Sequence, residues 1–184
     1  MQAMSPTKNG RSWGLSSSVP LASAGIIDSQ SVKSTESGGP RGYDAGKKIK
    51  GRKRHIVTDT LGNVLDAIVH TANIQDRDGA RGLIEFVKEN VPTLTKIFGD
   101  GGYGGEKLAA AMAHIDGIVL EIVKRSDTAA GFVVLAKRWI VERTSAWLGR
   151  CRRLAKDWET SIASSEAWLF LASVRRMTRA IARA

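Results

Sequence analysis

The stretch KIFGDGGYGG, at residues 96–105, contains the first group that could do chemistry, the carboxylate of Asp100. An apolar run ends at this aspartate, and glycines lie on both sides of it. A carboxylate at the end of a strand favours a hard cation such as Mg²⁺, which binds through one or two carboxylates together with substrate phosphates. The glycines would leave room for a phosphate backbone beside that ion. The structural alternative is that Asp100 caps the helix that follows.

Asp28 is the second candidate. It lies in the run GIIDSQSVK, which predicts a short strand, and the alternation of that strand places it on the face opposite Ile27. A carboxylate among apolar strand residues is costly to bury unless it is neutralised or coordinated. We therefore regard Asp28 as a possible partner of Asp100 at a cation.

Glu142 is the third candidate. Trp139 lies three residues before it and Ala146 four residues after it, so helical spacing predicts that Glu142 projects from an apolar face. Arg138 could pair with it at i,i+4, but an arginine that precedes a glutamate is in the weaker orientation and contributes only a few tenths of a kcal/mol. We favour a metal ion as the partner of Glu142.

The glycines around Asp100 also permit a different interpretation. Gly99, Gly101 and Gly104 read literally as G-x-G-x-x-G, the fingerprint of a dinucleotide-binding loop. Here, however, Asp100 would put a negative charge among the phosphates. The acidic residue expected about 20 positions later could only be Glu121, which lies inside a predicted strand. We therefore disfavour a dinucleotide site.

Turn signals and hydrophobic periodicity divide the chain into strands and helices that could position these acids. The residues LGN separate two β-rich runs and predict a hairpin. Strands are predicted over residues 25–33, 53–60, 64–71, 95–100 and 118–124, and helices over residues 79–90, 105–115, 136–158 and 164–183. Asp76 and Asp78 are the N-cap candidates of the first helix, which stops near Pro92. This order indicates an α/β layered domain at residues 26–160, with a flexible arm at residues 1–25 and a C-terminal helix at residues 161–184 packed on the domain.

The charge of the chain points to a polyanionic partner. Its 28 Lys and Arg residues against 18 Asp and Glu give a net charge of +10. Residues 41–54 and 137–156 each carry seven basic residues and one acid, and four arginines follow near the C-terminus. Clustered positive charge of this kind favours nucleic acid over general solubility.

The cysteine content and the apolar runs bear on the compartment. Cys151 is the single cysteine, so no internal disulfide can form and a reducing compartment fits. The longest apolar run near the end, AWLFLASV, is too short to cross a bilayer, and residues 1–25 lack the continuous apolar core of a signal peptide. We expect a cytoplasmic, nucleoid-associated bacterial protein with no membrane partner.

A set of longer blocks carries a family resemblance. They are IIDSQSVKSTESGGPRGYDAGKKIKGRKRHIVTDTLG, ANIQDRDGA, GDGGYGG, the stretch from LEIVKRSD through GFVVLAKRWIVERTSAWLGRCRRLAKDWE, and SSEAWLFLASVRRM. From about residue 25 to its end, the chain resembles the DDE transposases of bacterial insertion sequences, of the insertion-sequence-5 type within the type-4 superfamily. No single block has to carry the resemblance.

The resemblance implies a ribonuclease-H-like fold, a mixed five-stranded sheet flanked by helices. It implies that Asp28, Asp100 and Glu142 are the catalytic triad and the ligands of two Mg²⁺ or Mn²⁺ ions. In two-metal chemistry, water first cleaves a phosphodiester and releases a 3′-hydroxyl, which then attacks target DNA and joins the strands. The implied substrate is double-stranded DNA, both at the element ends and at the target.

The same resemblance implies DNA contacts. Arg138 matches the arginine of the family's Y-x2-R-x3-E-x6-K signature, although Leu135 stands at the tyrosine position and Gly149 at the lysine position. By its residue type alone, Tyr103 could either stack on a flipped base or pack beside the glycines. The other predicted phosphate contacts, which position DNA without reading its sequence, are Lys33, Lys53, Arg54, Arg143, Arg150 and Lys156.

Family members usually carry a separate N-terminal DNA-binding region, which residues 1–25 do not resemble. We therefore expect a second-frame or N-terminally truncated product whose protein partner is a second copy of itself or a full-length transposase. Two alternatives stay open. One is a nuclease of the same fold that cuts but does not join, and the other is a non-catalytic DNA-binding remnant that inhibits full-length transposase.

Overall fold

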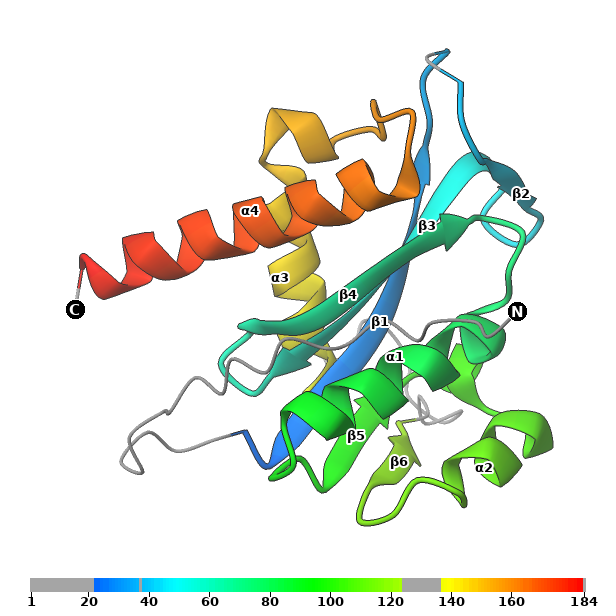
Figure 1. Ribbon diagram of the computed structural model, residues 1–184, viewed down its shortest axis with the longest axis vertical. Coiled ribbons are helices and arrows are strands. Elements are labelled where there is room, and N and C mark those ends of the chain that lie inside the picture. Colours follow the sequence, from blue (N-terminus) through cyan, green and yellow to red (C-terminus); the bar gives the residue numbers. More distant parts are fainter. Residues whose placement is uncertain (1–21, 37, 124–136, 184) are drawn as a thin grey trace, which may run out of the picture.

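The computed structural model describes residues 22–36, 38–123 and 137–183 (Figure 1). The predicted arm therefore falls almost wholly outside the described residues. The elements, in chain order, are β1 (Ala24–Lys33), β2 (Gly42–Asp44), β3 (Ile49–Asp59), β4 (Val64–Thr71), α1 (Asp76–Asn90), β5 (Lys96–Gly99), the 3₁₀ turn η1 (Gly101–Tyr103), α2 (Glu106–Met112), β6 (Val119–Ile122), α3 (Arg138–Gly149), the 3₁₀ turn η2 (Arg152–Leu154) and α4 (Ile162–Ile181).

The strands form one mixed sheet with the order β2-β3-β1-β5-β6, and β4 also pairs with β3. The hairpin predicted at LGN is confirmed, because β3 and β4 are antiparallel and joined there. β1 pairs antiparallel with β3, whereas β1, β5 and β6 are parallel to one another. All five predicted strands are present. The sixth strand, β2, lies between the first two predicted strands and was not predicted, because three residues are too few to show a periodic pattern.

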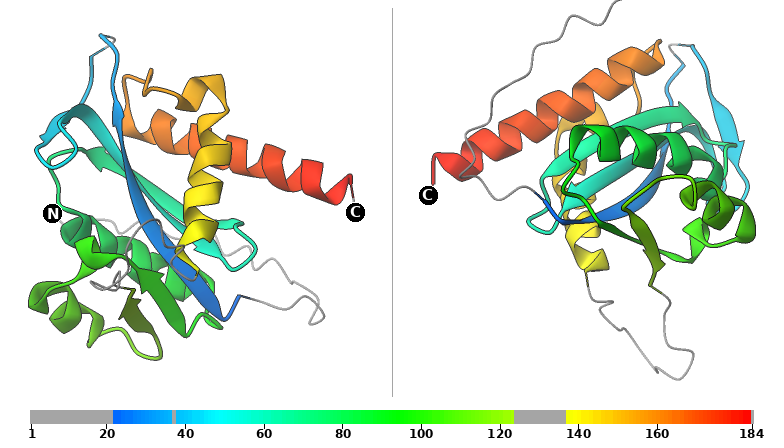
Figure 2. Two further views of the ribbon diagram at one scale, coloured as in Figure 1. Left: turned by 180° about the vertical axis from the view of Figure 1, so that it is seen from behind. Right: turned by 60° about the horizontal axis from the view of Figure 1, so that its bottom comes forward.

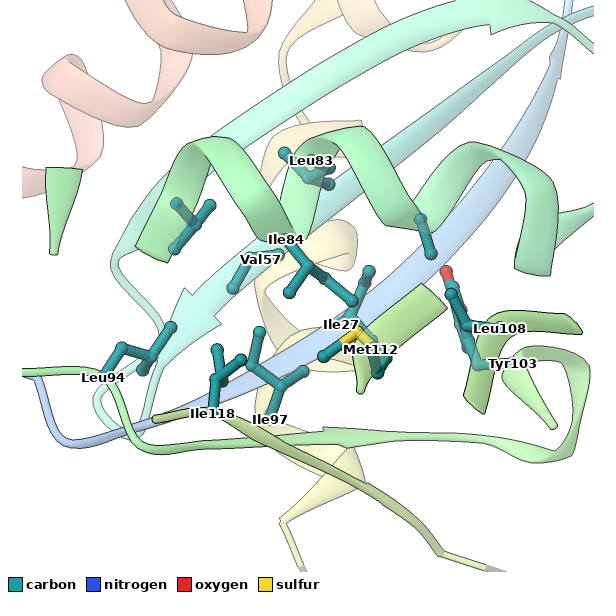
Figure 3. Packing of buried hydrophobic residues seen from close by; sticks show 12 residues of the cluster. Ile27, Val57, Leu83, Ile84, Leu94, Ile97, Tyr103, Leu108, Met112 and Ile118 are labelled. Atoms are coloured by element: carbon teal, nitrogen blue, oxygen red, sulfur yellow. The ribbon is translucent and has the colours of Figure 1, made fainter. Parts of the chain in front are cut away.

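Helices cover both faces of this sheet, because β1 is apolar on both sides. Ile27 faces a cluster closed by α1 and α2, shown in Figure 3, while Ile26 faces a second cluster closed by α3 and α4. The two further views in Figure 2 show α4 crossing the face of the sheet opposite α1. A strand buried on both faces is typical of the centre of a layered α/β domain. No helix in the described part of the chain is long and apolar enough to cross a membrane.

The packing of α1 against the sheet gives a testable prediction. A Cβ added to Gly79 would lie 2.5 Å from Nε2 of His70 and 2.9 Å from Nε2 of His55, whereas one added to Gly82, in the same helix, meets nothing within 4 Å. Alanine favours a helix interior by roughly 0.5–1 kcal/mol over glycine. We therefore expect Gly82→Ala to raise the free energy of unfolding by about that amount and Gly79→Ala to lower it, in urea titrations. Equal effects of the two variants would contradict this packing.

One long predicted helix is wrong in extent and in its buried face. The helix expected over residues 136–158 ends at Gly149, and η2 and an irregular segment follow it. The predicted apolar face included Trp139, but this side chain is 44% exposed. The residues that α3 buries instead are Ile140, Val141, Thr144 and Leu148.

A buried ion pair attaches the C-terminal segment to the sheet. The Arg52 and Asp157 side chains are both fully buried, and Nη1 of Arg52 lies 3.0 Å from Oδ1 of Asp157. Arg52 also donates to the backbone oxygens of Pro40, Thr160 and Ser161. Strand β3 is thereby bound to the chain that leads into α4.

Candidate active site

The sheet register brings two of the three predicted acids together. β1 and β5 are parallel neighbours in which Ile26 pairs with Phe98, so the register continued by two residues sets Asp28 level with Asp100. The alternation of β1 puts Asp28 on the side of Ile26, opposite Ile27, and the charges of Asp100 and Arg138 that act on Asp28 fit this placement. These two carboxylates therefore meet at the end of β5, on the side of the sheet that α3 covers.

The electrostatics of Asp28 reflect this position. The pKa of Asp28 is raised from 3.8 to about 6, chiefly by burial of the side chain and less strongly by the nearby charge of Asp100. The backbone amide of Ser29 and the positive charges of Lys47 and Arg138 lower this pKa, but they offset only part of the increase. A partly desolvated carboxylate beside a second carboxylate is a group that a cation would stabilise.

Arg138 connects Asp100 to Glu142. Its Nη2 lies 3.5 Å from Oδ2 of Asp100 and 3.2 Å from Oε1 of Glu142. The i,i+4 pair that the sequence offers as the ordinary explanation for Glu142 is therefore present. The predicted burial of Glu142 is wrong: its side chain is 54% exposed, because α3 turns its other face to the sheet.

Asp100 also caps the turn that follows it. Its Oδ1 accepts a hydrogen bond from the backbone amide of Gly102, with an N···O distance of 2.8 Å, at the start of η1. Oδ2 faces Arg138. A Cβ added to Gly101 would meet nothing within 4 Å, so the space beside this carboxylate is open. Capping and a role in the site are thus compatible, since each uses a different oxygen.

Asp28, Asp100 and Glu142 offer only carboxylate oxygens as ligands for a divalent metal ion. Among the described residues, which include all three acids, no group of three or more His, Cys, Asp or Glu side chains lies close enough to hold a metal ion. Two acids are adjacent, and the third reaches them through the guanidinium of Arg138. Carboxylate oxygens are the ligands that Mg²⁺ and Mn²⁺ prefer, so the residue types fit.

Two predicted DNA contacts lie in the interior, which corrects the sequence interpretation. Lys53 is only 5% exposed, and its Nζ lies 2.8 Å from Asp76 and 3.5 Å from Asp44. Arg54 is 3% exposed, and its guanidinium donates to the backbone oxygen of Leu154. DNA cannot reach either side chain, so both act as structural cations.

The predicted stacking of Tyr103 on a base is also corrected, because this side chain is only 1% exposed. Its hydroxyl lies 3.1 Å from Nδ1 of His55.

We expect Tyr103→Phe to lower the free energy of unfolding by about 1–2 kcal/mol, because a buried hydrogen bond is lost, and to leave DNA retention unchanged. Urea denaturation and filter binding would measure the two effects. A loss of DNA binding without loss of stability would restore the stacking interpretation.

The remaining predicted DNA contacts lie nearer the surface. Arg143 stacks between the rings of Trp139 and Trp147, each 4.5 Å from its guanidinium carbon. The other three, Lys33, Arg150 and Lys156, are exposed. They stay predictions as DNA contacts.

Sequence reasoning missed two charged residues beside the acids. Nζ of Lys47 donates to the backbone oxygen of Ser29 at 3.0 Å, and its charge lowers the pKa of Asp28. Asp76, at the start of α1, lies close enough to η1 that its Oδ2 would be 3.1 Å from a Cβ on Gly102. From the sequence, Lys47 is only one member of a basic cluster and Asp76 only the start of a helix. No sequence pattern near either residue indicates that it lies close to Asp28.

Comparisons with known proteins agree with this geometry. A chain in the cryo-EM structure of the simian T-cell lymphotropic virus intasome in complex with PP2A regulatory subunit B56 gamma superposes with a TM-score of 0.55 at 12% identity, over 83% of this chain and 48% of that one. That likeness confirms the ribonuclease-H-like fold, a curled mixed sheet flanked by helices.

Sequence comparison gives a nearer relative. A Burkholderia cepacia protein whose name describes it as a transposase for insertion sequence element IS402 is 32% identical over 111 residues, 56% of this chain. The chain spans about half of that relative's length, since the match covers 52% of it. The family described as "Transposase DDE domain" matches residues 20–177. Because that match takes in Asp28, Asp100 and Glu142 and most of the chain around them, this protein belongs to the transposase DDE domain family.

Proposed function

We propose that this chain is the catalytic domain of a transposase, which cuts phosphodiester bonds at the ends of an insertion sequence and joins the freed 3′ ends to target DNA. The observation that supports this most directly is the pairing of Asp28 with Asp100 at the end of β5, with Arg138 extending the site to Glu142. A carboxylate whose pKa is raised, beside a second carboxylate at one end of a sheet, is a candidate reaction centre.

Asp28, Asp100 and Glu142 would hold two Mg²⁺ or Mn²⁺ ions. Ions bound there activate the attacking oxygen and stabilise the leaving oxygen of an in-line displacement at phosphorus. The family uses divalent metals in general, and the all-carboxylate donor set of this chain fits them.

The protein's own residues have defined tasks in this proposal. Arg138 neutralises Asp100 and Glu142 while no substrate is bound, and its planar fork can turn one N–H edge to a phosphate. The open space at Gly101 admits the sugar-phosphate backbone beside Asp100. The cap that Asp100 forms on η1 holds its carboxylate in one orientation.

A strand-transfer assay tests the proposal. The chain is incubated with a labelled duplex that ends in a free 3′-hydroxyl and with a supercoiled plasmid, in Mg²⁺ or Mn²⁺. We expect joined products from the wild type and none from Asp100→Ala, while both proteins retain DNA on a filter. Cutting without joining would identify a nuclease of the same fold. Wild type and variant that are equally inert, yet bind DNA, would indicate a non-catalytic remnant.

The proposed partners are duplex DNA and a second protein chain, either another copy of this one or a full-length transposase. The proposed location is the bacterial cytoplasm, at the nucleoid, where such a protein would meet DNA. Light scattering of the chain with and without DNA would report the number of copies in the complex.

A further inference from the structure

A basic groove lies where α3, η2 and α4 meet. It is a cavity of about 500 Å³ whose walls include Trp147 and Cys151. Its charged lining consists of Arg150, Arg175, Arg176, Arg179 and Arg183. We propose that this groove, separate from the catalytic acids, binds the phosphate backbone of duplex DNA. The proposal rests on the proposed function, since duplex DNA is the substrate of that reaction.

The groove concentrates positive charge without compensation. None of its lining residues is acidic. Within the described parts of the chain, no ion pair or hydrogen bond engages the guanidinium groups of four of its arginines, which are Arg150, Arg175, Arg179 and Arg183. Unpaired guanidinium groups that converge on one cavity favour a ligand with several negative charges, because each planar fork can donate two hydrogen bonds to a phosphate.

The spacing of the arginines on α4 strengthens this inference. Arg175 and Arg179 are at i,i+4, so they lie on one face of α4, about 6 Å apart along its axis, and Arg183 follows four residues later, just beyond the end of the helix. Like charges at this spacing weaken an isolated helix. The helix dipole favours cations only in the last turn, which leaves Arg175 without that compensation. A polyanion bound along the helix would remove the repulsion.

A ladder of stacked side chains runs from the groove along α3 as far as Trp139. Arg176 stacks on Trp147 with 5.1 Å between its guanidinium carbon and the ring centre, and Arg143 lies between Trp147 and Trp139. Nη2 of Arg176 is also held by Oδ1 of Asn63 at 2.6 Å. Two side chains of the groove wall, Trp147 and Arg176, are therefore held by neighbouring residues.

The direction of this ladder favours DNA over an acidic protein segment. Trp139 lies one turn from Glu142 on α3, and Arg150 lies about 12 Å further along the axis of the same helix. A duplex in the groove would thus run along α3 toward the catalytic acids. An isolated acidic peptide site would need no such continuity.

Salt-dependent binding tests the groove. Affinity for a short labelled duplex of mixed sequence is measured by anisotropy in EDTA, so that failure of catalysis cannot be confused with failure of the groove. Each phosphate contact contributes about 0.9 to the slope of log K against log salt concentration. We expect Arg175→Gln with Arg179→Gln to reduce that slope by about 1.8 and to weaken binding at least tenfold near 0.1 M salt. The charge-preserving pair Arg175→Lys with Arg179→Lys should retain most of the slope.

A matched control removes two charges from another part of the surface. Arg81 and Lys107 form exposed ion pairs on α1 and α2, away from the groove. We expect Arg81→Gln with Lys107→Gln to leave the slope near its wild-type value. If the control and the groove variant lower the slope equally, net charge explains the binding and the proposal fails.

Cys151 provides a second measurement, because it is the single cysteine of the chain and lines the groove. We expect saturating duplex DNA to slow its alkylation by a thiol reagent at least several-fold. Unchanged alkylation with DNA fully bound would place the DNA elsewhere and overturn the proposal. Protection by a poly-glutamate peptide but not by DNA would also overturn it, in favour of an acidic protein partner.

Discussion

Asp28→Asn is expected to abolish strand cleavage and joining while making the protein more stable at neutral pH. The wild-type carboxylate is partly desolvated and faces Asp100, which raises its pKa to about 6. An asparagine of the same shape carries no charge in this place. From that pKa, we expect the free energy of unfolding at pH 7 to rise by about 1–3 kcal/mol. Catalytic residues commonly lower stability in this way.

The sign of the pH dependence follows from the same pKa. Asp28 binds a proton more tightly in the folded protein than in the unfolded chain, where its pKa is 3.8. Its contribution to stability is therefore fully present below about pH 4 and is lost as the pH rises through about 6. Urea titrations in EDTA across this range should show the loss in the wild type and not in Asp28→Asn.

Divalent metal supplies the control for this experiment. A ligand that binds only the folded state raises its stability, so Mn²⁺ should stabilise the wild type and have less effect on Asp28→Asn. A variant that is inactive, less stable than the wild type and equally responsive to Mn²⁺ would mean that Asp28 has only a structural role.

Arg52→Met is expected to lower the free energy of unfolding by about 3–5 kcal/mol, the usual cost of removing one partner from a buried ion pair. The change leaves Asp157 buried beside Ser165, whose hydroxyl donates to it. Arg54 still lies 3.9 Å from Asp157, so we expect a value in the lower part of this range. The loss should appear in urea titrations as a lower midpoint.

Arg153→Met is the matched control for Arg52. Arg153 pairs with Glu159 at 2.6 Å, in the same segment, but its side chain is 47% exposed. Exposed ion pairs usually contribute less than about 1 kcal/mol. If the two variants lose the same stability, the attachment of the C-terminal segment to β3 does not depend on the buried pair.

The sequence predicted the strands well because their signals are local. The alternation around Asp28 and the apolar run before Asp100 define β1 and β5 without knowledge of the rest of the chain. Once both strands belong to one parallel pair, the proximity of the two aspartates follows from the register. This part of the candidate site was therefore accessible from residue types and spacing.

The roles of the basic residues in β3 could not be predicted in the same way. Lys53 and Arg54 look like surface charges, yet acids from distant segments, Asp76 and Asp157, neutralise them in the interior. No local pattern reveals which acid will arrive beside a given cation. The prediction of which face of α3 is buried was wrong for a related reason, since Trp139 stacks on Arg143 instead of entering the core.

The parallel pairing of β1 with β5 limits where this protein can accept inserted residues. Three pairs, Ala24–Lys96 to Ile26–Phe98, set the register. Side chains alternate along a strand, so one extra residue within either strand would turn an aspartate to the wrong face. Lengthening the loop between β1 and β2 costs little, because the entropy of closing a loop grows slowly with its length. Variation in chain length is thus confined to the connections, while β1 and β5 must keep their length.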